Sequence, residues 1–156
     1  MATNQMSTAE AVLDFRVPAK PHLARVVREG VAEFATARGV GGEDLGHFMI
    51  ALGEALANAI EHGGADRPIE VEVRIDAERI VATITDGGAG FSADLPPEPK
   101  LPDLAAERGR GLPIMRRCSD IFAIKSEAGQ GTAVVVGRYL KRSRHAAVGT
   151  SVLGLA

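Results

Sequence analysis

The sequence predicts an α+β fold, a two-layer sandwich with helices packed on one face of a mixed, mainly antiparallel sheet. Segments with alternating apolar residues follow one another in pairs joined by short turns, which is the pattern of β-hairpins. Amphipathic segments with apolar residues at helical spacing stand between these pairs. The order is strand, two helices, two strands, helix, two strands. Since hairpins rather than helical crossovers join most neighbours, this order favours an antiparallel sheet covered on one side.

The first third of the chain predicts one strand and two helices. Residues 11–17 alternate as a short strand that Pro18 ends. Residues 21–38 form a helix with a proline in its first turn, and residues 45–62 form a second helix after a glycine-rich break. The apolar side of the first helix is expected to hold Leu23, Val26, Val27, Val31, Phe34 and Ala35.

The remaining elements follow a similar alternation. Strands are expected over 69–75 and 80–85, a short helix over 112–118, and a final strand pair over 121–126 and 132–140. Between the two halves, a proline-rich stretch predicts an irregular surface loop that could act as a lid over residues 92–104.

Composition indicates one globular domain. The 156 residues are 46% hydrophobic and 24% charged, which suits a domain over 11–140, a disordered segment over 1–10 and a loose basic tail over 141–156. A net charge of −2 and a pI near 6.1 give no support for nucleic-acid binding. The sequence holds no membrane-length apolar run, no signal-peptide pattern and one cysteine, so we expect a cytoplasmic protein without disulfides or membrane contact.

The helix expected over 45–62 has two distinct sides. Apolar residues gather on one face, while Glu54, Asn58 and Glu61 follow at i, i+4 and i+7 on the other. Asparagine is a poor residue for mid-helix, so Asn58 needs another reason to be there. Three small residues flank the polar side and would let a ligand approach the backbone: Ala51, Ala55 and Ala57.

Three glycine-rich turns follow this helix. Residues 86–90 end a strand, residues 108–111 precede a short helix, and residues 129–132 lie in the last hairpin. Glycines permit positive φ or close backbone approach, and a glycine-rich turn before a helix N-terminus is a natural phosphate seat. Neither a phosphate-binding loop nor a dinucleotide fingerprint is present. The sequence therefore predicts a nucleotide site of another kind.

Taken together, these segments resemble the Bergerat-fold ATPases, the superfamily of gyrase and the histidine kinases. Residues 54–63 look like its N box, 86–90 its G1 box, 108–111 its G2 box and 129–132 its G3 box. The pattern Glu-Ala-x-x-Asn-Ala-Ile-x-His-Gly and the short lid are most similar to the anti-sigma factor serine kinases. The resemblance covers about residues 12–140.

The resemblance implies a role for each matched residue. Asp86 would accept a hydrogen bond from the adenine amino group, with Thr132 nearby through a water. Asn58 would offer its amide oxygen to Mg²⁺, and Glu54 would act as general base on the attacking hydroxyl. Arg108 would pair with phosphate oxygens. Four glycines would let the backbone approach ATP: Gly88, Gly90, Gly109 and Gly111.

The implied function is a Mg²⁺-ATP-dependent protein serine/threonine kinase that acts as an anti-sigma factor. It would phosphorylate an anti-sigma factor antagonist, alternately hold a sigma factor, and form a homodimer. Two alternatives stay open. One is a detached histidine-kinase catalytic domain, which the lack of a preceding phosphoacceptor helix pair makes less favoured. The other is a binding module that ATP gates without phosphotransfer.

Overall fold

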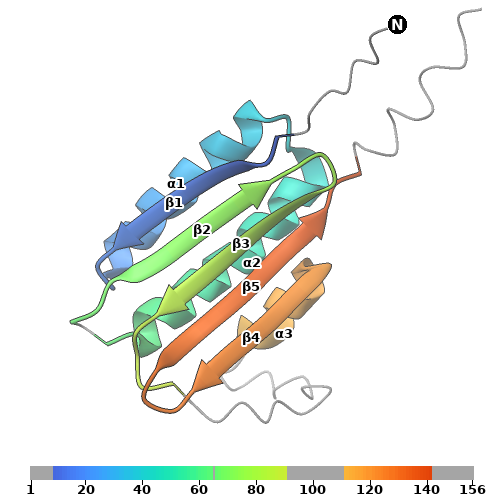
Figure 1. Cartoon of the computed structure of the whole chain (residues 1–156). Helices are drawn as coiled ribbons and strands as arrows, with labels where there is room; N and C mark the ends of the chain where they lie inside the picture. Colours follow the sequence, from blue (N-terminus) through green and yellow to red (C-terminus); the bar gives the residue numbers. More distant parts are fainter. Residues whose placement is uncertain (1–8, 65, 91–110, 142–156) are drawn as a thin grey trace, which may run out of the picture.

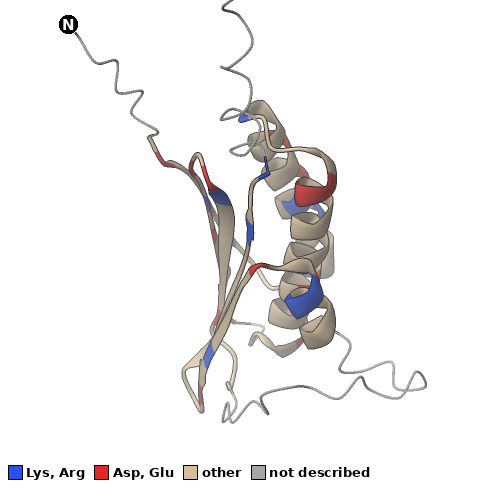
Figure 2. Cartoon of the chain, turned by 90° about the vertical axis from the view of Figure 1, so that its right-hand side faces the viewer, with Lys and Arg blue, Asp and Glu red and all other residues tan. Residues whose placement is uncertain are grey.

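The computed structural model describes residues 9–64, 66–90 and 111–141. In this part of the chain a single sheet forms one layer and three helices form the other (Figure 1). Seen edge-on, the helices all lie on the same side, so the described chain leaves the second face of the sheet without a helix (Figure 2). The predicted α+β two-layer sandwich is confirmed.

The described strands pair in the order β1-β2-β3-β5-β4, and every pairing is antiparallel. The sheet is thus fully antiparallel in this part of the chain, where the sequence predicted a mixed one. The reason is that two antiparallel helices return the chain between β1 and β2, while hairpins join β2 to β3 and β4 to β5. The strands are β1 Ala11–Val17, β2 Ile69–Ile75, β3 Arg79–Asp86, β4 Ile121–Glu127 and β5 Gly131–Tyr139.

Three helices cover the sheet: α1 Pro21–Ala37, α2 Gly42–His62 and α3 Gly111–Cys118. Proline at the first position of α1 loses no helical hydrogen bond. Gly39 follows α1 with a φ of 77°, the left-handed conformation that ends many helices. The long helix α2 lies centrally and contacts α1, α3 and the strands β3 and β5. It therefore joins the other two helices to the two strands β3 and β5.

The core lies between α2 and the sheet, and it corrects two expectations about helix faces. Phe48, Leu52 and Leu56 are fully buried there. Val26, expected on the apolar side of α1, is 52% exposed because Val27 and Val31 already occupy the buried side of that helix. Three alanines were expected beside the polar stripe of α2. Two of them, Ala51 and Ala55, are instead fully buried in the core, while Ala57 is exposed.

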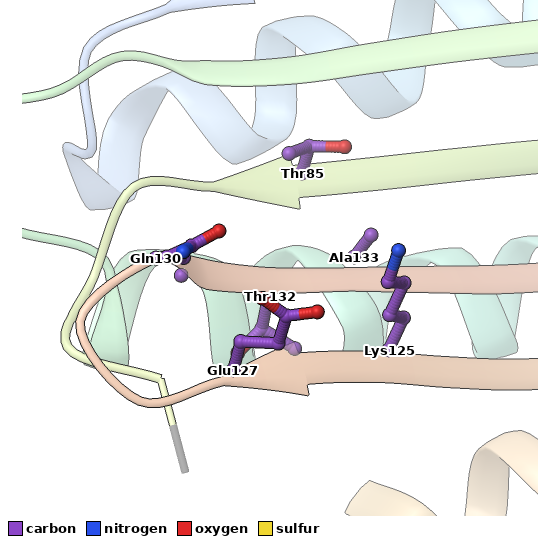
Figure 3. A pocket seen from close by; sticks show the side chains of 7 residues that line it. Thr85, Lys125, Glu127, Gln130, Thr132 and Ala133 are labelled. Carbon is purple, nitrogen blue, oxygen red and sulfur yellow. The ribbon is translucent and has the colours of Figure 1, made fainter.

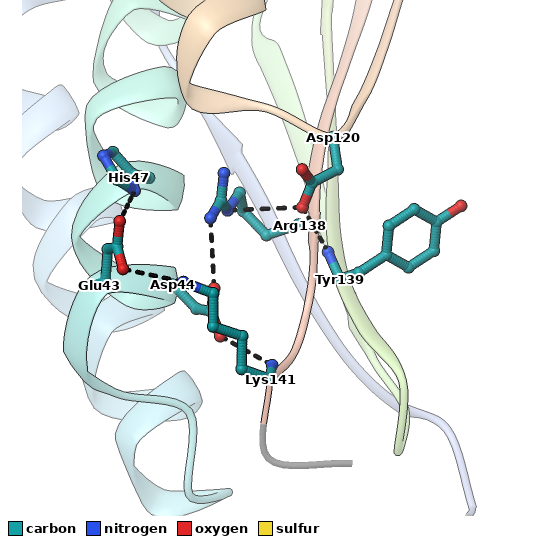
Figure 4. Close-up of polar contacts among 7 residues, drawn as sticks. All are labelled: Glu43, Asp44, His47, Asp120, Arg138, Tyr139 and Lys141. Atoms are coloured by element: carbon teal, nitrogen blue, oxygen red, sulfur yellow. Dashed lines mark hydrogen bonds and ion pairs between the residues drawn. The ribbon is translucent and has the colours of Figure 1, made fainter. Parts of the chain in front are cut away.

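Charged groups join the start of α2 to the end of β5 (Figure 4). Arg138 Nη2 lies 3.3 Å from Asp44 Oδ1, and both side chains are about nine-tenths buried. Asp44 Oδ2 accepts the backbone N–H of Lys141 at 2.9 Å, while Lys141 Nζ donates to Glu43 at 2.8 Å. Asp120 Oδ2 lies 3.6 Å from Arg138 Nε and accepts the Tyr139 N–H. Lys141, the first residue of the expected tail, is therefore attached to α2.

Candidate functional site

Glu54 and Asn58 lie one turn apart on α2, and both side chains are half-buried beside the start of α3. Glu54 Oε2 and Asn58 Nδ2 are each 3.3 Å from the point where a side chain at Gly111 would begin. Within the described chain, no hydrogen bond occupies either polar group. The two groups therefore converge on the same stretch of α3 backbone and are available to a ligand.

Asp86 is the last residue of β3 and is only 7% exposed. Its Oδ1 accepts the backbone N–H of Gly88 at 2.9 Å, which satisfies one lone pair of a buried carboxylate. Among the described residues, the other oxygen, Oδ2, has no donor. An acceptor held in this way at low exposure is suited to a ligand that brings its own N–H group.

Thr132 is the register partner of Asp86 on β5, so the two side chains emerge side by side on the helix-covered face. Thr132 Oγ1 lies 2.8 Å from Ser126 Oγ on β4, its register partner on the other side. Sequence reasoning missed Ser126. The signal that could have found it is the hairpin length, because a turn over 128–130 pairs Ser126 with Thr132.

Close packing of the protein's own backbone requires glycine at three positions in the turns after β3 and β4: Gly88, Gly90 and Gly131. A side chain at Gly88 would collide with the His62 carbonyl oxygen, and one at Gly90 with that of Glu127. Gly90 and Gly131 also have φ values of 65° and 87°, which side-chain-bearing residues rarely adopt. Glycine at these positions lets the turn after β3 pack closely against α2 and β4. The contact of Gly88 and Gly90 with a nucleotide stays a prediction.

Of the predicted site, the structure brings Glu54, Asn58 and Gly111 together, and it places Asp86 beside Thr132. Arg108 and Gly109 lie outside the described residues, as does the expected lid over 92–104. Residues 1–8 and 142–156 lie outside them too. From the expected N-terminal segment, Glu10 is described, and its Oε2 lies 3.0 Å from Arg74 Nη1.

A separate hollow of about 140 Å³ lies on the face of the sheet that carries no helix (Figure 3). Thr85, Lys125, Glu127 and Ala133 are among the residues that line it. Because neighbouring residues of a strand point to opposite faces, Asp86 is directed away from the face that Thr85 occupies. Thr132 of the site also lines this hollow, so the hollow adjoins the site around Asp86 across β5.

The polar groups of Asn58, Asp86 and the start of α3 are of the chemical types that bind Mg²⁺ and ATP. The amide of Asn58 offers a hard oxygen of the type that Mg²⁺ accepts, and Mg²⁺ usually takes its other ligands from phosphates and water. Gly111 begins α3, so unpaired backbone N–H groups and the positive end of the helix dipole lie next to Glu54 and Asn58. The buried acceptor Asp86 suits the amino group of adenine.

Comparison with known proteins agrees with the fold. A sequence model described as "Histidine kinase-like ATPase domain" matches residues 17–137, and the chain belongs to this family. The predicted family is thereby confirmed, and ATP is the nucleotide that such a domain implies.

Among curated relatives, the chain is 26% identical over 151 residues to a serine-protein kinase RsbW of Bacillus pumilus. The match spans 89% of this chain and 92% of the relative. An anti-sigma F factor of Clostridium beijerinckii is 30% identical over 101 residues, which are 60% of this chain and 70% of the relative.

A solved structure shares the fold. It contains the RsbU and RsbW domains of Rv1364c from Mycobacterium tuberculosis, with a TM-score of 0.64 at 22% identity over 83% of this chain and 32% of that one.

Within the described residues, no helix has both the length and the apolar character to span a bilayer.

Proposed function

We propose that this protein is a Mg²⁺-ATP-dependent protein serine/threonine kinase that acts as an anti-sigma factor. Its substrate is an anti-sigma factor antagonist and its second partner a sigma factor, to which it binds alternately as a cytoplasmic homodimer. The observation that carries the proposal is the convergence of Glu54 and Asn58 on Gly111. The names of the relatives, serine-protein kinase and anti-sigma F factor, support the substrate class and the partners.

Bound Mg²⁺-ATP supplies the phosphoryl group and the charge neutralisation that its transfer needs. The protein's own residues position the reactants. Asn58 would offer its amide oxygen to the metal, the N-terminus of α3 would hold the phosphates, and Asp86 Oδ2 would accept an adenine N–H. Arg108 and Gly109, which come just before α3 in the sequence, would complete the phosphate contacts.

Glu54 is the proposed general base. Its carboxylate is half-buried, is not held by a hydrogen bond within the described chain and lies one turn from Asn58. It would take the proton of a substrate serine hydroxyl as the serine oxygen bonds to the transferred phosphorus. The bond between that phosphorus and the bridging oxygen of ADP breaks, so the proton ends on a Glu54 oxygen, the phosphoryl group on the serine, and ADP leaves.

The test uses labelled ATP, Mg²⁺ and a desalted extract of the source cells as the supply of substrate. Wild type should produce an acid-stable phosphoprotein, and Glu54→Ala should bind Mg²⁺-ATP in calorimetry with near-normal affinity while producing none. Glu61→Ala, an exposed carboxylate on the same helix, is the matched control and should keep full transfer.

Each other result overturns part of the proposal. Acid-labile label would indicate a histidine acceptor and the detached histidine-kinase alternative. Nucleotide binding without any labelled protein would indicate an ATP-gated binding module. Normal transfer by Glu54→Ala would refute the role of this carboxylate, and no binding of Mg²⁺-ATP by wild type would refute the whole proposal.

A further inference from the structure

The strand β1 forms one edge of the described sheet, and β4 forms the other (Figure 1). Within the described chain β1 pairs only with β2, so every second N–H and C=O group of β1 points outward without a strand partner. Its inward-facing residues Leu13, Phe15 and Val17 are only partly buried, whereas those of β2 are at most 3% exposed. The described chain therefore leaves both the backbone and the apolar side chains of this edge open.

The outward-facing side chains of β1 carry opposite charges two positions apart. Asp14 and Arg16 are both exposed on the helix-free face. Arg16 Nε lies 3.7 Å from Glu70 Oε1 on β2. The register partner of Asp14 is instead Glu72, another carboxylate, which is already paired with Arg74. Among the described residues Asp14 has no cationic partner, so a cation on the outer side of β1 would relieve a contact between like charges.

A second copy of β1, placed antiparallel along this edge, supplies that cation in one register. Facing residues of paired strands point to the same face, so even positions meet even positions and odd positions meet odd ones. A register centred on Phe15 sets Asp14 opposite Arg16 of the second copy, and two-fold symmetry repeats this ion pair. On the inner face the same register sets Leu13 opposite Val17 of the second copy, so charged and apolar rows match together.

The neighbouring registers and the other edge strand fit less well. Centring on Asp14 sets two carboxylates opposite each other, and centring on Arg16 sets two guanidinium groups opposite each other. On β4, a register centred on Ser126 sets Lys125 opposite Glu127, but it leaves only three residue pairs before the strand ends. The register centred on Phe15 gives five pairs within β1.

We propose that β1 is a homodimer interface, at which the β1 strands of two copies pair antiparallel about Phe15 and join the two sheets into one. This inference rests on the proposed function in its homodimer, whose contact surface it names, and it does not depend on phosphotransfer. A two-fold axis perpendicular to the sheet keeps both helix layers on the same side. Asp86 and Thr132 lie on strands away from this edge, so the pairing leaves that part of both proposed ATP sites open.

The test measures mass in solution by sedimentation equilibrium on the full chain. Wild type should form a dimer, with twice the 16.3 kDa mass of the chain. Asp14→Arg and Arg16→Asp each bring like charges together at both contact points, so each should raise the dimer dissociation constant roughly 10-fold or more. An equimolar mixture of the two variants should dimerise with about the wild-type affinity, because each introduced charge then faces an opposite one. Lys125→Glu, a charge reversal on the exposed side of the other edge strand, is the matched control and should leave the dimer intact.

Each other result overturns the inference. A wild-type chain that stays monomeric would refute both this interface and the proposed homodimer, while transfer from labelled ATP still tests the kinase separately. A dimer that withstands Asp14→Arg, or one that Lys125→Glu breaks, would place the contact elsewhere on the chain. A mixture of the two β1 variants that stays monomeric would show that they act by disturbing the fold and not through opposite charges across the interface.

Discussion

Replacing Asp44 by alanine tests how firmly α2 is attached to the sheet. Asp44 and Arg138 are about 10% and 12% exposed, and Asp44 Oδ1 lies 3.3 Å from Arg138 Nη2. The same carboxylate accepts the Lys141 N–H. Asp44→Ala therefore leaves a largely buried guanidinium with Asp120, whose carboxylate is 3.6 Å away, and leaves one backbone donor without its acceptor.

The expected loss of stability is about 3 kcal/mol. Removing one member of a buried pair costs about 3–5 kcal/mol when nothing compensates the remaining charge. Asp120 reduces that cost, while the lost bond from Lys141 adds about 1 kcal/mol. For a chain of this size the loss corresponds to roughly 10 °C in the unfolding midpoint.

Urea unfolding followed by circular dichroism, without nucleotide, measures this loss. Glu43→Ala is the matched control, because Glu43 also stands in the first turn of α2 and pairs with Lys141, but through side chains that are 63% and 59% exposed. That variant should lose much less stability than Asp44→Ala, because water screens the exposed pair. Equal losses of stability in the two variants would refute the idea that burial makes the Asp44–Arg138 pair more stabilising than the exposed Glu43–Lys141 pair. Mg²⁺-ATP affinity should be unchanged in both, since the proposed site lies toward the other end of α2.

Three further predictions concern pH and two glycine positions. Burial acts to raise the pKa of Asp44, but hydrogen bonds from Lys141 and Arg138 outweigh it and hold that pKa below its usual range. The stability from Asp44 is therefore complete above about pH 4 and lost as pH falls through the lowered pKa, so urea curves of wild type and Asp44→Ala should converge in acid. Gly111→Ala should reduce phosphotransfer at least about 10-fold with little change in stability, because the new methyl group displaces the side chains of Glu54 and Asn58. The control Gly46→Ala should retain activity, because nothing lies within 4 Å of its new methyl group. Gly90→Ala should lower the free energy of unfolding in urea by at least about 2 kcal/mol more than Gly129→Ala. Both glycines have positive φ, but only a side chain at Gly90 would meet backbone atoms. Equal losses in the two variants would contradict this.

Local pattern alone predicted most elements of the described fold. Apolar alternation located the strands to within about one residue, and helical spacing found α2 and its polar stripe. The same pattern could not separate the two sides of α1 correctly at Val26, because the width of the buried face depends on how α1 packs on α2. Nor could it show that Ala51 and Ala55 face the core rather than a ligand.

The sequence by itself predicted the residue types of the candidate site, since the spacing of Glu54 and Asn58 and the glycines after Asp86 are local patterns. Only the tertiary structure decided what surrounds them. Glu54 and Asn58 converge on Gly111, more than 50 positions away in the chain, because α3 packs against α2. Ser126 joins Thr132 and Asp86 because strand register brings three strands into one row. Helix packing and register depend on contacts between distant segments, and no local period encodes them.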